Sequence, residues 1–356
     1  MLAPALRDEF GLSLTEVGIL LSAAWFGATF TLLPWGLAAD RIGERWAITA
    51  GIGLCGLGFA AAAFAQDFRT LCVLLALAGA AGSSVNSASG RAVMAWFPPE
   101  QRGLALGIRQ AAIPIGGALA ALALPTIEHA GGIEAAFVAI ACVSLVGAAA
   151  ALLVIRDPPR EPSVAEAVPR TLRDRRLWLL CASGGCYVIA QIALISFVVL
   201  YLHDERGWSD SAAAAVLAAI QVLAVAARIG AGAWSDRVRS RVGPLRLVGV
   251  ATAVTVGLVA VLLDSPTWLV VGAFVAAGVV AMSWNGLSFA AAAEFGGYAR
   301  SGAAIGMQQT ALGIAGLAAP VVFTALVSTS GWQAAYGVAA LFPLAGWALL
   351  APLASR

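Results

Sequence analysis

Hydrophobic and polar positions alternate on a long scale in this chain, with apolar stretches of about twenty residues separated by short polar breaks. A helix needs about 20 mainly apolar residues to cross the hydrocarbon core of a bilayer. Eleven stretches meet that requirement, so the pattern predicts an all-α, polytopic membrane bundle. Their approximate limits are 16–38, 46–66, 69–94, 103–126, 133–155, 177–202, 210–234, 246–264, 266–291, 301–326 and 332–353.

Composition favours the same fold class. Hydrophobic residues fill 61% of the 356 positions and charged residues only 11%, whereas soluble domains carry about 25% charged residues. So apolar a composition is typical of a protein whose surface meets lipid, and we expect the bilayer itself as a partner. The formal net charge is only +2, so we expect no nucleic-acid partner.

The polar residues form no pattern of enzymatic or metal chemistry. His129 and His203 are isolated, and the cysteines include no CxxC pair. No nucleophile–base pair, metal cluster or phosphate-binding loop is present. We therefore expect no enzyme and no cofactor. The cysteines, which we interpret as structural thiols, are Cys55, Cys72, Cys142, Cys181 and Cys186.

Arginines indicate the orientation, because loops on the cytoplasmic side of membranes are enriched in basic residues. One set of loops together with the C-terminus holds sixteen arginines, whereas the opposite side holds only Arg7, Arg69 and Arg206. We predict that the first set, and the C-terminus, face the cytoplasm of a bacterial inner (plasma) membrane. The sixteen are Arg41, Arg45, Arg91, Arg102, Arg156, Arg160, Arg170, Arg173, Arg175, Arg176, Arg237, Arg239, Arg241, Arg246, Arg300 and Arg356.

One polar break is much longer than the others. Residues 156–176 contain four prolines and dense charge, which excludes a membrane span. This segment is predicted to be a cytoplasmic linker between an N-terminal half, 1–155, and a C-terminal half, 177–356.

The two halves repeat each other. Gly36–Arg45 (GLAADRIGER) corresponds to Gly232–Arg241 (GAWSDRVRSR) at an offset of 196 residues. Gly107–Gly117 (GIRQAAIPIGG) corresponds to Gly306–Gly316 (GMQQTALGIAG) at an offset of 199. Parallel repeats joined by a cytoplasmic loop are a transporter architecture, with the binding site between the repeats.

These residues carry a resemblance to a known family. The pattern G-x3-D-R-x-G-x-R stands here as Gly36, Asp40, Arg41, Gly43 and Arg45, after an apolar span, and is repeated in the second half. The chain thereby resembles the major facilitator superfamily. The resemblance implies secondary transport by alternating access and two halves of six helices each.

The resemblance also assigns the first span to the second helix of the family. Residues 1–15 then correspond to the outer loop before it, so the family's first helix is missing from this sequence. We expect the native chain to begin upstream of Met1.

For the gate, the resemblance implies a role for two carboxylates. Asp40 would meet the N-terminus of the helix that begins near Ser301, and Asp236 would meet the helix that begins near Gly103. The alternative is that these charges only determine topology. The other gating candidates are Arg41, Arg45, Arg237 and Arg241.

Apart from the arginines assigned to the loops, Arg109 and Arg228 are the two within the predicted spans. A charged side chain at membrane depth costs about 2.5–3.5 kcal/mol on insertion scales and is usually functional. Arg228-x3-Gly232-x3-Asp236 is also similar to a pattern of oxalate and monocarboxylate carriers, in which the arginine pairs with the substrate carboxylate. The alternative is that both arginines reach back to the cytoplasmic interface.

Several uncharged polar residues lie inside predicted spans and are further candidates for contact with a solute. The alternative is that they join helices by hydrogen bonds. They are Asn86, Asn285, Tyr187, Gln191, Gln221 and Gln308.

The leading functional hypothesis is alternating-access transport of a small organic anion such as a carboxylate. It rests on the embedded arginines and on the absence of any carboxylate deep within a predicted span. The alternatives are an exporter of drugs or hydrophobic metabolites, and a non-transporting product that lacks the first helix. We expect a monomer whose partners are a small-molecule solute and a coupling ion, by symport or antiport.

Overall fold

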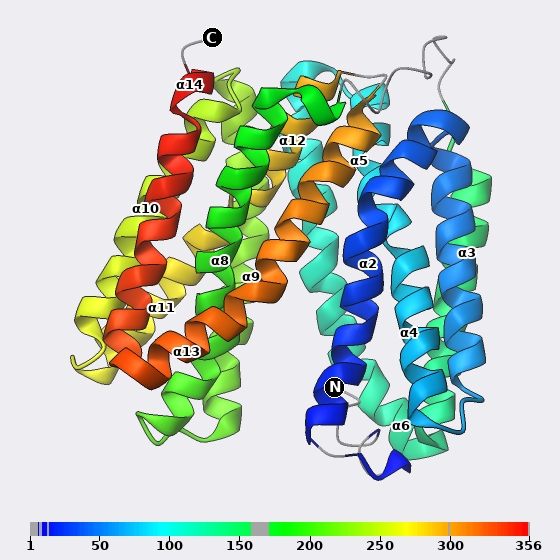
Figure 1. Cartoon of the computed structure of the whole chain (residues 1–356), viewed down its shortest axis with the longest axis horizontal. Helices are drawn as coiled ribbons and strands as arrows, with labels where there is room; N and C mark the ends of the chain where they lie inside the picture. The colour runs from blue at the N-terminus through cyan, green and yellow to red at the C-terminus, as the bar shows by residue number, and fades with distance from the viewer. Residues whose placement is uncertain (1–5, 7–8, 13, 158–170, 298–299, 355–356) are drawn as a thin grey trace. The chain divides into compact units, whose positions relative to one another are not determined.

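The computed structural model describes residues 6, 9–12, 14–157, 171–297 and 300–354, and these residues form helices and no strand (Figure 1). The linker prediction falls mainly on 158–170, outside the described residues. The helices are α2 (Leu14–Ile42), α3 (Glu44–Ala62), α4 (Phe68–Gly82), α5 (Ser84–Trp96), the short 3-10 helix η1 (Pro99–Gln101), α6 (Arg102–Val154), α8 (Arg175–Asp204), α9 (Asp210–Arg237), α10 (Val242–Leu262), α11 (Thr267–Ala281), α12 (Asn285–Gly296), α13 (Ser301–Leu349) and α14 (Ala351–Ala354).

All eleven predicted apolar stretches lie on these helices. The two longest helices each cover two stretches, because a glycine with positive φ bends the chain between them. In α6 the bend is at Gly132 (φ 75°), and in α13 it is at Gly331 (φ 80°). Residues other than glycine rarely adopt this backbone conformation. By length and composition, eight helical segments in the described part of the chain could cross a membrane.

Two predicted spans are interrupted where continuous helices were expected. The stretch 69–94 breaks between α4 and α5 at Ser83, and the stretch 266–291 breaks between α11 and α12 at 282–284. The offset of 199 relates Ser83 to Met282, so the breaks belong to the internal repeat. Ser83 and Ser283 both donate hydrogen bonds to carbonyls three residues earlier, which favours a tight turn over a continuous α-helix.

The chain forms two compact units, and each is described separately. Unit 1 comprises Met1–Trp96, Ile115–Arg173 and Gly296–Thr310. Unit 2 comprises Phe97–Pro114, Asp174–Phe295 and Ala311–Arg356. Each unit thus contains one short segment from the opposite half of the sequence. The predicted division into halves at 156–176 is a statement about the sequence and stays a prediction.

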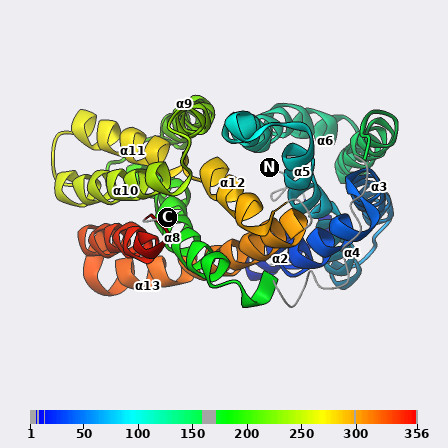
Figure 2. The ribbon, with the colours of Figure 1, turned by 90° about the horizontal axis from the view of Figure 1, so that it is seen from above.

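Unit 1 is built around α2, which packs along α4 (Figure 1). Its core joins Leu20 of α2, Leu71 of α4 and Phe137 of α6. In unit 2, α10 and α11 lie side by side (Figure 2).

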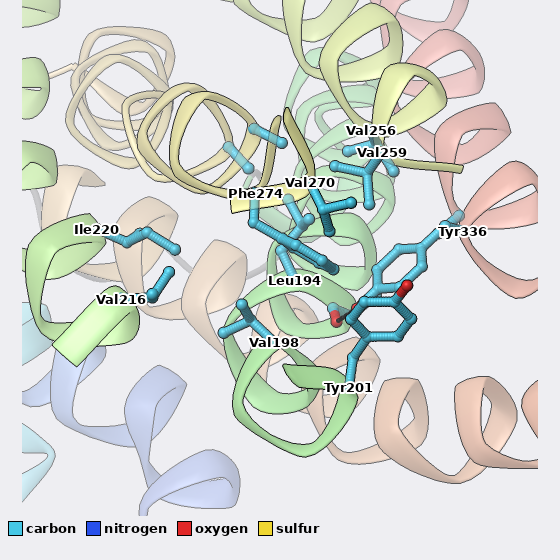
Figure 3. Packing of buried hydrophobic residues seen from close by; sticks show 14 of the residues in the cluster. Leu194, Val198, Tyr201, Val216, Ile220, Val256, Val259, Val270, Phe274 and Tyr336 are labelled. Carbon is cyan, nitrogen blue, oxygen red and sulfur yellow. Dashed lines mark hydrogen bonds between the residues drawn. The ribbon is translucent and has the colours of Figure 1, made fainter. Parts of the chain in front are cut away.

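The core of unit 2 is aromatic at one end (Figure 3). The ring of Phe274 lies 5.5 Å from those of both Tyr201 and Tyr336. Both hydroxyl groups are satisfied, since Tyr201 donates to the carbonyl of Leu263 and Tyr336 to that of Ala193. These ring contacts pack α8, α11 and α13 against one another at this end of unit 2.

Candidate functional site

Asp40 lies near the end of α2 and is only 5% exposed. Its Oδ1 accepts a hydrogen bond from the backbone N–H of Gly302 (3.0 Å), and its Oδ2 accepts one from Ala303 (2.8 Å). These N–H groups belong to the first turn of α13, where no partner exists within the helix and the helix dipole is positive. We call this arrangement the Asp40 contact. It joins Asp40 to the helix near Ser301, as the family resemblance implied.

Asp236, near the end of α9, makes the corresponding contact in unit 2. Its Oδ1 accepts a hydrogen bond from the N–H of Gly103 (2.9 Å) and its Oδ2 from that of Leu104 (2.7 Å). Both N–H groups belong to the first turn of α6. This Asp236 contact repeats the Asp40 contact atom for atom, at the sequence offsets of the internal repeat.

Glycines allow the helices to approach closely at both contacts. A Cβ atom at Gly36 would collide with the carbonyl of Gly302, and one at Gly232 would collide with the carbonyl of Gly103. The first glycine of the sequence pattern is therefore explained by space, because any side chain would separate the two helices.

Arginines neutralise both carboxylates, but from different positions. Arg91 of α5 lies 3.2 Å from Asp40 (Nε–Oδ1) and 2.8 Å from Glu44 (Nη1–Oε1). In unit 2, Arg241 pairs with Asp236 and with Glu294. Our topology count was wrong to place Arg91 among the loop arginines, because it is buried within a helix. Its position inside the predicted span 69–94 was the signal that could have identified Arg91 as a buried arginine.

The other gating candidates lie apart from these contacts. Arg45 donates from Nε to the carbonyl of Leu152 (2.8 Å) and from its backbone N–H to Asp157 (3.0 Å). Arg41 and Arg237 are exposed, and neither forms an ion pair with a described residue. Of the predicted arginines, only Arg241 lies at a carboxylate contact.

Arg228 is buried in α9, with 4% of its surface exposed. Its Nε donates to the carbonyl of Met282 (3.0 Å) and its Nη1 to the carbonyl of Gln110 (2.9 Å). Met282 lies at the break between α11 and α12, so Arg228 binds a carbonyl that the interrupted helix leaves free. No carboxylate of the described residues lies within ion-pair distance of Arg228.

Arg109 lies on α6 beside the same residue. Its Nη1 donates to the side-chain Oε1 of Gln110 (2.7 Å), and its guanidinium lies 5.9 Å from the centre of the Phe289 ring. Gln110 therefore receives one hydrogen bond from each of the two arginines. The sequence predicted both arginines but not the glutamine that connects them.

Tyr187 and Gln191 are engaged with other parts of unit 2. The Tyr187 hydroxyl donates to the carbonyl of Leu245 (3.3 Å), and Gln191 Oε1 accepts from the indole N–H of Trp284 (3.0 Å). The rings of Tyr187 and Trp284 meet edge to face at 5.6 Å. Trp284 was not among the predicted residues; its position in an apolar span gave no signal that the helix breaks there.

The remaining polar candidates are divided between the units. Asn285 and Gln221 belong to unit 2, and each has a buried side-chain oxygen without a hydrogen bond among the described residues. Asn86 and Gln308 belong to unit 1, where the backbone carbonyl of Asn86 accepts a hydrogen bond from Gln309 Nε2 (2.8 Å). None of these four residues takes part in the hydrogen bonds by which Gln110 connects Arg228 with Arg109 in unit 2.

An open surface depression lies elsewhere, in unit 1 between α2 and α4. None of the predicted site residues lines it, and its walls are almost entirely apolar. It is lined by Ile19, Ser22, Ala23, Phe26, Cys72, Val73 and Ala76. The described residues contain no cluster of histidine, cysteine, aspartate and glutamate that could hold a metal ion.

The helices of the described residues define a multi-pass helical membrane protein. The sequence profile of the Major Facilitator Superfamily matches residues 1–297, and this chain belongs to that family.

Known proteins agree with this assignment. An uncharacterized MFS-type transporter of Mycobacterium tuberculosis is 34% identical over 97% of this chain and 78% of its own length. The probable sulfoacetate transporter SauU of Cupriavidus necator is 27% identical over 92% of this chain and 82% of its own length. The crystal structure of the Escherichia coli fucose:proton symporter FucP superposes with a TM-score of 0.78, at 16% identity, over 98% of this chain and 94% of that one.

Proposed function

We propose that this protein carries a small organic anion, such as a carboxylate, across a bacterial inner membrane by alternating access. The observation that carries the proposal is the buried Arg228, whose guanidinium bonds only backbone carbonyls among the described residues. A buried cation without a carboxylate partner keeps an uncompensated charge, and an anionic solute would compensate it.

The geometry of the arginines suits a carboxylate. Two of the guanidinium nitrogens of Arg228 are occupied by carbonyls, which leaves Nη2 to donate to a ligand. Arg109 is connected to it through Gln110 and is not fully buried. A planar guanidinium held in place before the ligand arrives loses little entropy on binding an anion.

The comparison with SauU supports an acidic solute, because sulfoacetate carries both a carboxylate and a sulfonate group.

For the gate, we propose that the Asp40 and Asp236 contacts hold the cytoplasmic side closed. Each connects the end of one helix to the first turn of another, so the ends cannot separate until both carboxylates release their N–H groups. In this proposal the orientation is the one that the arginine distribution predicts, with the C-terminus and the linker facing the cytoplasm.

Uptake into membrane vesicles tests the proposal. Labelled sulfoacetate, oxalate and lactate would be supplied to vesicles that contain this protein, beside a dye-efflux assay and vesicles without the protein. We expect saturable uptake of at least one anion and no dye efflux. Dye efflux without anion uptake would favour a drug exporter, and neither activity would favour a non-transporting product.

A further inference from the structure

Gln110 is buried on α6, with only 5% of its surface exposed, and its polar atoms differ in their surroundings. The backbone carbonyl accepts a hydrogen bond from Arg228 Nη1 (2.9 Å), and the side-chain Oε1 accepts one from Arg109 Nη1 (2.7 Å). The amide nitrogen, Nε2, forms no hydrogen bond with a described residue. A buried donor without a partner has lost the hydrogen bonds that water would supply, so an acceptor on a ligand would restore them.

The orientation of the Gln110 amide follows from its contact with Arg109. An arginine side chain can only donate, so the atom that faces Arg109 Nη1 is the amide oxygen. The amide nitrogen therefore faces away from this contact, and it too can only donate. The bond from Arg109 thus determines which atom Gln110 offers to a ligand.

A proline explains why Arg228 reaches the backbone carbonyl of Gln110. In an α-helix this carbonyl would accept from the N–H four residues later, but that residue is Pro114, which has no N–H. The helices also lie close together here, since a Cβ atom at Gly107 would lie 2.7 Å from the carbonyl of Arg228. The Nη1 group of Arg228 therefore replaces the missing donor, and its Nη2 group, on the same guanidinium carbon, lies near Gln110.

The repeat-related glutamine of unit 1 has no such spare donor. The offset of 199 relates Gln110 to Gln309, whose Nε2 donates to the backbone carbonyl of Asn86 (2.8 Å). The same offset relates Pro114 to Gly313, which keeps its N–H. The free amide nitrogen and the free carbonyl of Gln110 are therefore specific to unit 2 and are not required by the repeated architecture.

On the basis of the proposed function, we propose that Gln110 is a specificity-determining ligand of the solute. Its Nε2 and the Nη2 of Arg228 each donate to an oxygen of the acid group. Both atoms can only donate, so they favour an ionised carboxylate or sulfonate, whose oxygens only accept. A hydroxyl, an amide or a protonated acid would turn a hydrogen toward one of these donors. Arg109 acts through Gln110, by holding the amide in the orientation that offers Nε2.

Equilibrium binding of labelled sulfoacetate, oxalate and lactate to the purified full-length chain tests this role. Thermal unfolding of each variant is measured with and without the anions that the wild type binds. Gln110→Met keeps the length of the side chain but loses the donor, and should weaken binding about 10- to 100-fold. Gln110→Glu places a negative charge beside Arg109, where it takes the part of the anion. It should abolish binding and raise the unfolding temperature of the anion-free protein, a gain that loss of a merely structural glutamine would not produce.

Gln309→Met is the matched control. It removes the hydrogen bond to the carbonyl of Asn86, so it should lower the unfolding temperature but bind the anion with wild-type affinity. Wild-type affinity in both Gln110 variants, or an equal loss of affinity in Gln110→Met and Gln309→Met, would overturn the role of Gln110 and leave the proposed function standing. A wild type that binds none of the three anions would contradict the proposed function, and the role of Gln110 with it.

Discussion

Two backbone N–H groups converge on Asp40 and two on Asp236, and none of the four has a partner within its own helix. A carboxylate at such a place stabilises the helix start by about 1–2 kcal/mol when it is partly buried. An asparagine keeps the shape but loses the charge and one acceptor oxygen.

Asp40→Asn should therefore slow transport and leave expression intact. Initial rates in vesicles, normalised to the amount of protein, measure this. Arg41→Gln is the matched control, because it removes an exposed charge next to Asp40 and should transport at the wild-type rate. Unchanged transport in Asp40→Asn would show that the charge of Asp40 is not needed for gating and only helps to determine topology.

Arg228 offers a second test at the same scale. Lysine keeps the charge but carries its donors on one nitrogen, so it lacks the planar fork with which Arg228 reaches the carbonyls of Met282 and Gln110 from two nitrogens and keeps a third for a ligand. Arg228→Lys should bind the anion more weakly by about 1.5–3 kcal/mol, and Arg228→Ala should abolish transport.

Equilibrium binding of the anion, together with thermal unfolding of each variant, separates lost binding from lost stability. Arg237→Lys is the control, since Arg237 is exposed on the same helix. If both Arg228 variants bind the anion with wild-type affinity, Arg228 serves only to hold the helix break.

Some of these residues could be predicted from the sequence, and others could not because their contacts depend on packing. The Asp40 contact could be expected from the resemblance to the family, because the repeated carboxylate motif that carries the resemblance is visible in the sequence. The pairing of Asp40 with Arg91 could not, because it depends on the packing of α2 against α5. Gln110 was missed for a similar reason: its backbone carbonyl, which no side-chain pattern reveals, accepts the hydrogen bond from Arg228.

Among the helices, hydropathy located the apolar segments but not their interruptions. Ser83 and the residues 282–284 are compatible with a span, so an average over twenty residues does not register the break. The bends within α6 and α13 were predicted as boundaries between stretches. They occur at Gly132 and Gly331, which the repeat offset of 199 relates to each other.

Gly331→Ala tests one of these bends. Its φ of 80° and ψ of 171° are nearly exclusive to glycine, so alanine should cost about 1–3 kcal/mol of stability. The matched control is Gly337→Ala, a helical position that also has open space around its Cβ. Alanine there should stabilise by about 0.5–1 kcal/mol. Thermal unfolding in detergent should thus shift in opposite directions, and a common shift would contradict the assigned strain.

For the whole molecule, the arginine distribution predicts the topology. Reporter fusions at Pro162 and Arg356 should be active only in forms that report a cytoplasmic location, because, with the buried Arg91 set aside, fifteen arginines are predicted on that side and three on the other. A fusion at Trp208, in the loop between α8 and α9, should report the opposite side. Periplasmic activity at Pro162 or Arg356 would reverse the orientation and, with it, the side assigned to the Asp40 and Asp236 contacts.

The exchange of short segments between the units has a consequence for biosynthesis. Unit 1 includes Gly296–Thr310, so the N–H partners of Asp40 leave the ribosome only after most of unit 2 has been made. The first half therefore cannot reach its final packing while it is the only part inserted. A ribosome-bound chain stopped before residue 296 should be cleaved by protease near α2. A longer chain, from which Ala303 has left the ribosome, should be cleaved there more slowly.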